Sequence, residues 1–100
     1  MNLKDEFDPI RSWATARGIY SSSDLKTQTI KLLEEFGELA KGIIKSNNAE
    51  IEDAIGDIAV VLTNVAHLHG TSIEECINKA YKVIENRTGS MKGGSFIKDE

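Results

Sequence analysis

Acidic side chains are concentrated in one part of this sequence. Seven carboxylates fall within residues 34–57, and the apolar stretch that follows, residues 58–68, contains none. Carboxylates on neighbouring helical turns repel one another, and an Asp beside a core-forming segment is costly to bury unless a cation compensates it. The spacing therefore indicates a site that takes up a cation.

The first group of these carboxylates belongs to a predicted helix from Leu25 to about Lys45, in which apolar residues recur at helical spacing. At 100° per residue, a polar stripe borders the apolar arc of this helix. The stripe consists of Gln28, Lys31, Glu35 and Glu38. Glu34 points about 100° away from Glu35 and is interpreted as a solvent-facing residue.

The second group belongs to a helix that is predicted to follow a short break at residues 46–48 and to run to His69. One stripe of this helix consists of Glu50, Asp53, Asp57 and Asn64, whereas Glu52 faces elsewhere. Beyond Asp57 the helix is apolar almost all round, so we expect Asp57 to be drawn towards the interior.

An antiparallel hairpin of these two helices would bring one set of carboxylates together. The set consists of Glu35, Glu38, Asp53 and Asp57. Oxygen ligands of this kind suit a hard divalent cation, so we predict Mg²⁺, with Mn²⁺ as a second possibility, rather than zinc.

Other metal sites fit the sequence less well. A di-iron bundle needs Glu-x-x-His pairs, and neither His67 nor His69 has a Glu three residues before it. No twelve-residue window has the alternating acids and central glycine of an EF-hand. We interpret both histidines as ordinary residues near a helix end. The aromatic residues Phe7, Trp13 and Tyr20 are interpreted as core residues rather than as a platform for stacking a nucleobase.

The remaining elements complete an all-α chain that forms a single domain, residues 1–100. A first helix is predicted from Asp8 to Arg17, with a loop at residues 20–24 after it. Two overlapping capping boxes, Thr71 with Glu74 and Ser72 with Glu75, begin a last helix that reaches about Asn86. The tail, residues 86–100, contains glycines and is predicted as loop, with one extended piece from Ser95 to Lys98. We therefore expect a helical hairpin or four-helix bundle.

Composition excludes several classes of protein. A formal net charge of -4 argues against binding nucleic acid by bulk phosphate neutralisation. The single cysteine, Cys76, excludes an intrachain disulfide and favours a cytoplasmic setting, and we interpret it as packing material. The apolar run from Ile58 to Leu68 is too short to span a bilayer, so we predict no membrane association.

With these residues placed, the sequence resembles the MazG-like family of all-α nucleoside triphosphate pyrophosphohydrolases, in the manner of its short, phage-type single-domain members. The first acidic motif is "EEFGE", residues 34–38, and the second is "DAIGD", residues 53–57. The flanking segments "WATARGI", "IEDAIGDIAVVL" and "ENRTGSMKGGSFIKD" carry the same resemblance. The second motif departs from the family pattern, because Ala54 stands where the family has Glu. Either Asp53 replaces that ligand or three carboxylates and water hold the metal.

The resemblance implies Mg²⁺-dependent cleavage of a nucleoside triphosphate to the monophosphate and pyrophosphate. It also implies a homodimer or homotetramer with substrate at the subunit boundary. Glu35, Glu38 and Asp57 would be the catalytic, metal-binding carboxylates. The residues expected to contact the substrate are Gln28, Lys31, Arg17, Asn64, Arg87, Lys92 and Lys98.

Two alternatives stay open at this point. The chain could be a non-catalytic helical module whose acidic stripe docks a basic partner. It could also be a protein of the same fold whose activity is lost or redirected, a hypothesis that the alanine at position 54 motivates.

Overall fold

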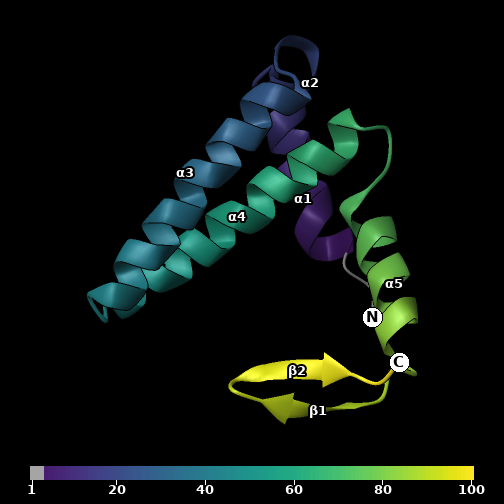
Figure 1. The fold of residues 1–100 in the computed structure, drawn as a ribbon. Coiled ribbons are helices and arrows are strands. Elements are labelled where there is room, and N and C mark those ends of the chain that lie inside the picture. The colour runs from purple at the N-terminus through teal and green to yellow at the C-terminus, as the bar shows by residue number, and fades with distance from the viewer. Residues whose placement is uncertain (1–3) are drawn as a thin grey trace.

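The computed structural model describes residues 4–100 and consists of helices followed by one small β-hairpin (Figure 1). In chain order the elements are α1 (Lys4–Ala16), α2 (Ile19–Ser22), α3 (Leu25–Ile44), α4 (Asn48–Leu68), α5 (Ile73–Ile84), β1 (Gly89–Lys92) and β2 (Ser95–Lys98). The predicted all-α class and the antiparallel hairpin of the two acidic helices are confirmed. The four long helices correspond to the four that the sequence predicted.

Side-chain caps begin three of these helices where the sequence predicted a start. Asp24 accepts a hydrogen bond from the backbone N–H of Thr27 at 2.7 Å at the start of α3. Asn47 accepts one from Glu50 at 3.1 Å at the start of α4, and Ser72 begins α5 in the same way. Each cap satisfies a backbone donor that has no partner within its helix.

Helices α3 and α4 form the antiparallel hairpin on which the rest of the chain is built (Figure 1). Ser46 ends α3 in a left-handed conformation, with φ of 55°, and Asn47 then begins α4. The two helices approach most closely near this turn, because a Cβ at buried Gly42 would lie only 3.2 Å from the backbone nitrogen of Ile51. A side chain at Gly42 would therefore push the two helices apart.

The segment before α3 packs against the C-terminal half of α4 and differs from the prediction in two ways. α1 begins at Lys4 rather than Asp8 and has Pro9 inside it. The predicted loop at residues 20–24 is wrong in part, because its first residues belong to the one-turn helix α2. Gly18, with φ of 76°, reverses the chain, and its carbonyl accepts a bond from the N–H of Ser22 that closes this turn.

Two side-chain contacts tie the outer helices to the hairpin and to each other. The hydroxyl of Tyr20 donates to the amide oxygen of Asn64 at 2.8 Å, and the Tyr20 ring stacks on His67 with centroids 3.8 Å apart. Arg11 of α1 donates two hydrogen bonds to the carboxylate of Glu74 in α5, at 2.7 and 2.6 Å. The predicted capping box of Thr71 with Glu74 is wrong, because Ser72 and not Thr71 is the N-cap of α5.

The core of the described chain is small. Its buried apolar residues are Ala14, Ala54, Val61 and Ala66. Many large apolar side chains stay exposed, and those on α3 are Leu25, Ile30, Leu33, Phe36, Ile43 and Ile44. The prediction that Trp13 belongs to the core is wrong, because 45% of its surface is exposed. Cys76 is exposed as well, which contradicts its interpretation as packing material.

The tail forms a β-hairpin where the sequence predicted loop with one extended piece. The extended piece at Ser95–Lys98 is confirmed as β2, and the sequence-based prediction missed its partner β1. The strands pair antiparallel from Gly89 with Lys98 to Lys92 with Ser95. Gly93 and Gly94 both have positive φ and form the two-residue turn, which is the signal that the sequence offered for a hairpin.

No helix within residues 4–100 is both long enough and apolar enough to cross a membrane.

Replacing Glu74 with Ala should destabilise the fold, because the guanidinium of Arg11 would lose two hydrogen bonds at a site where its side chain is only 18% exposed. We expect the free energy of unfolding to fall by about 1.5–3 kcal/mol, the range for a hydrogen bond to a charged group, because Arg11 keeps only Asp8 as a partner among the described residues. Urea denaturation at fixed protein concentration measures the change.

Asp8→Ala provides the matched control, because Asp8 also pairs with Arg11 but its side chain is 60% exposed. An exposed pair contributes roughly 0.2–1 kcal/mol. Equal losses for the two variants would contradict the view that the Arg11–Glu74 pair holds α1 to α5.

Candidate active site

The carboxylates of α3 and α4 meet in one small cavity between the two helices. The cavity measures about 110 Å³ and is lined by Glu35, Glu38, Glu50, Asp53, Ala54 and Asp57. We call it the acidic cavity. All four carboxylates that the sequence predicted as metal ligands line it.

Glu35 is the best-shielded carboxylate that α3 brings to the acidic cavity. It lies at the edge of the apolar arc and is half-buried, whereas Glu38, three residues further on, is exposed. Partial burial raises the pKa of Glu35, and the nearby Asp57 and Glu38 carboxylates raise it further. The positive charge of Lys31 opposes these effects. Like charges are therefore held close to one another here, which disfavours the ionised form of Glu35.

α4 brings three carboxylates to the acidic cavity, and one of them was missing from the predicted ligand set. Asp53 and Asp57 are there as predicted. Glu50 also lines the cavity. The helical projection had placed Glu50 on the same stripe, so the signal was present in the sequence. Its position one turn before Asp53 and Ala54 brings it into the cavity.

Ala54 is the apolar residue in the lining of the acidic cavity. Its side chain is buried, with 2% of its surface exposed, and it lines the acidic cavity beside Asp53. Glu34 and Glu52 do not line the cavity and are exposed, which is where the projection had placed them. Helix geometry therefore accounts for which acidic side chains line the cavity and which face solvent.

The oxygen atoms available in the acidic cavity suit a hard divalent cation, because every polar side chain that lines the cavity is a carboxylate. Within residues 4–100, no three His, Cys, Asp or Glu side chains are grouped closely enough to hold a metal ion as they stand. Glu38, Glu50 and Asp53 are exposed and free to change rotamer. Small rotations of these side chains would therefore be needed to bring carboxylate oxygens onto one ion.

Two of the predicted substrate-binding residues lie outside the acidic cavity and are buried. Asn64 has 3% of its surface exposed, and its amide oxygen accepts from Tyr20. The amide nitrogen of Gln28 donates to the hydroxyl of Ser23 at 3.0 Å. In the described chain both side chains contribute to packing around α2 and the start of α3.

Four of the five predicted basic residues fall into two groups. Lys31 lies beside the acidic cavity, close enough to affect Glu35. Arg87, Lys92 and Lys98 belong to the tail, which lies beyond the end of α5 and away from α3 (Figure 1). The chain by itself thus brings Lys31, and not the basic residues of the tail, to the carboxylates.

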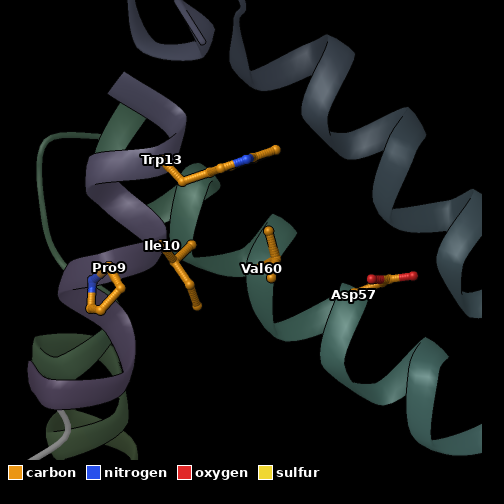
Figure 2. Close-up of a pocket in the computed structure, with 5 residues that line it drawn as sticks. All are labelled: Pro9, Ile10, Trp13, Asp57 and Val60. Atoms are coloured by element: carbon orange, nitrogen blue, oxygen red, sulfur yellow. The ribbon is translucent and has the colours of Figure 1, made fainter. Parts of the chain in front are cut away.

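A second cavity adjoins the acidic one and is apolar. It measures about 370 Å³ and lies between α1 and α4, lined by Pro9, Ile10, Trp13, Asp57 and Val60. Figure 2 shows the indole of Trp13 extending from α1 on the same side as Val60 and Asp57 of α4. Asp57 lines both cavities. We call this second space the Trp13 cavity.

Arg17, the last predicted cation, is associated with the Trp13 cavity rather than with the carboxylates. Its guanidinium carbon lies 5.1 Å from the centroid of the Trp13 ring, within the range of a cation–π contact. Arg17 does not line the cavity itself.

Glu35→Gln should stabilise the metal-free protein near neutral pH. The pKa of Glu35 is raised in the folded state, so the folded state holds this proton more tightly than the unfolded state does. Stability is therefore lost as pH rises from the ordinary Glu pKa through the raised one. Urea denaturation in the presence of a chelator at about pH 7.5 and about pH 4 should show a gain for Glu35→Gln that shrinks at the lower pH.

Glu34→Gln is the control, because Glu34 is the neighbouring acid and faces solvent. It should change stability little at either pH. A Glu35→Gln gain that is equally large at both pH values would rule out charge repulsion as its cause.

Comparison with known proteins agrees with these features. Residues 24–91 match the family described as the MazG nucleotide pyrophosphohydrolase domain. An uncharacterized 18.2 kDa protein from the rep-hol intergenic region of Haemophilus phage HP1 (strain HP1c1) is 44% identical over 65 residues. That match covers 65% of this chain and 40% of the phage protein. No solved structure matches the chain. The family match includes both acidic motifs and more than half of the residues, and the chain therefore belongs to the MazG nucleotide pyrophosphohydrolase family.

Proposed function

We propose that this protein is a Mg²⁺-dependent nucleoside triphosphate pyrophosphohydrolase that produces a nucleoside monophosphate and pyrophosphate. The observation that carries the proposal is the acidic cavity, in which five carboxylates from two facing helices line one space. A triphosphate is strongly negative, so these side chains could only repel it without an intervening cation. The family supplies the position of cleavage, which the charges alone do not.

Mg²⁺, when bound, would screen the substrate's charge and could lower the pKa of an attacking water. Glu35, Glu38 and Asp57 are the proposed principal ligands. Asp53 and Glu50 line the same cavity on the α4 side, so either can supply the oxygen that Ala54 lacks. Lys31 would balance part of the remaining phosphate charge, because it lies beside Glu35 at the edge of the cavity.

The proposed enzyme acts as a homodimer or homotetramer. The exposed apolar residues of α3 occupy a broad face beside the surface that packs on α4, and Ile44 alone leaves 82% of its surface exposed. Apolar area of this extent on a small chain is typical of an interface. A second copy would cover this face. It could also bring Arg87, Lys92 and Lys98 to the acidic cavity, which they do not reach within one chain.

The purified protein should convert nucleoside triphosphates to monophosphate and pyrophosphate only when Mg²⁺ or Mn²⁺ is present. Ca²⁺ should support the reaction less well, because its looser coordination holds the attacking water less firmly. Phosphorus NMR on a panel of ribo- and deoxyribonucleoside triphosphates identifies the products. Diphosphate with orthophosphate would indicate a different reaction, and no turnover of any triphosphate would favour a non-catalytic module.

Substitutions of acidic residues should distinguish the metal ligands from acidic residues that do not bind the metal. Glu35→Ala, Glu38→Ala and Asp57→Ala each remove a proposed metal ligand. We expect each to lower kcat/KM by more than about 100-fold, because losing a residue that only supports a metal ligand already costs up to about 100-fold. Comparing Asp53→Ala with Glu50→Ala identifies which of the two acids is the metal ligand that replaces the Glu expected at position 54. Glu34→Ala and Glu52→Ala are the controls, because both side chains lie outside the cavity. Equal losses in the controls would contradict the assignment.

The assembly can be tested with one residue on the exposed face of α3. Leu33, with 63% of its surface exposed, would be covered by a second copy. Leu33→Asp should weaken association by about 10- to 100-fold, as expected for losing a buried Leu. Analytical ultracentrifugation at micromolar concentration measures it, with Glu34→Lys on the adjacent solvent face as control. A monodisperse, folded wild-type monomer would overturn the proposed assembly.

A further inference from the structure

Trp13, the one tryptophan of this small chain, is exposed rather than buried in the core. It lies in the last turn of α1, where the sequence predicted a core residue, yet 45% of its surface is exposed. Its indole borders the Trp13 cavity, whose other apolar walls are Pro9, Ile10 and Val60. The volume of about 370 Å³ falls within the range of small-molecule pockets, roughly 300–1,000 Å³.

The position of the Trp13 cavity restricts what could occupy it. Asp57 lines both this cavity and the acidic cavity, so the two spaces lie on either side of one carboxylate. A ligand that fills both needs a flat apolar end and an anionic end that a metal ion can link to carboxylates. A nucleotide has both ends, with the base and the phosphates joined by a short sugar.

The indole lines the Trp13 cavity and 45% of the surface of Trp13 is exposed, so such a ligand can reach the ring. The guanidinium of Arg17 lies over the ring at 5.1 Å from its centroid, and Arg17 does not line the cavity. The ring is carried by a helix that Arg11 fastens to α5 through Glu74. The platform is thus held in place before a ligand arrives, which lowers the entropic cost of binding.

We propose that Trp13 stacks on the base of the nucleotide, and that the Trp13 cavity is the base-binding part of the site. This inference rests on the proposed function for the identity of the ligand. Pro9, Ile10 and Val60 have no side-chain hydrogen-bonding groups, and Asp57 is assigned to metal. The cavity therefore recognises the face of a base and not its edge. All bases are accepted, and purines bind more tightly than pyrimidines because they offer a larger stacking surface.

Fluorescence provides a direct test, because Trp13 is the only tryptophan in the chain. The intact wild-type protein is titrated in the presence of Mg²⁺ with AMP, CMP and ribose 5-phosphate. Ribose 5-phosphate is the matched control, since it has the sugar and the phosphate but no base. We expect saturable quenching by AMP, weaker quenching by CMP at the same concentration, and none by ribose 5-phosphate.

Kinetics on variants give a second readout that does not depend on the indole signal. Trp13→Ala should raise KM for ATP by about 5- to 100-fold, the equivalent of roughly 1–3 kcal/mol for one stacked base, and change kcat much less. Trp13→Phe should recover most of the loss, because a phenyl ring also stacks. Circular dichroism melting of both variants checks that they are folded.

The outcomes separate this inference from the proposed function. Turnover of triphosphates with an unchanged KM in Trp13→Ala, and equal effects of AMP and ribose 5-phosphate, would overturn the role of Trp13 and leave the enzyme assignment intact. Base-dependent quenching without turnover would support the base site and reject the activity. A third outcome is Trp13 emission that is blue-shifted without ligand, is unaffected by AMP and changes when the protein is diluted. It would show that a second copy covers Trp13, and it would overturn the inference.

Discussion

The packing of α3 against α4 holds like charges together, and the other features of the molecule depend on this constraint. The helices approach closely near Gly42, where a Cβ would lie 3.2 Å from the backbone of Ile51, and buried Ala54 lines the acidic cavity between them. Apolar contact thus outweighs the repulsion that raises the pKa of Glu35. The energy stored in that repulsion is available to any cation that relieves it.

The same hairpin accounts for the uneven burial of the chain. α1, α2 and α5 cover the C-terminal half of α4, but no long helix of residues 4–100 covers the outer apolar face of α3. Polar side chains within the covered part have partners, as Asn64 has in Tyr20. The chain therefore has a well-ordered centre at α4 and an apolar surface on α3 that a second copy is proposed to bury.

Trp13 and the basic tail show how much the location of a residue decides its role. An aromatic residue in an amphipathic helix is most simply explained as core, and only the packing of α1 across α4 leaves the indole beside Asp57. Arg87, Lys92 and Lys98 suit phosphate in their chemistry, yet they sit on and beside a hairpin that lies apart from α3 (Figure 1). Chemistry at the carboxylates can involve them only through contacts between chains.

The sequence by itself determined the helices, the cap at Ser72, and which acidic residues line the cavity and which face solvent, because capping and helical periodicity are local properties. It also carried the turn signal of Gly93 and Gly94. Only the tertiary structure decided that Glu74 binds Arg11 and that Trp13 is exposed beside the acidic cavity. These features depend on how residues distant in the chain pack together, and no local pattern specifies that packing.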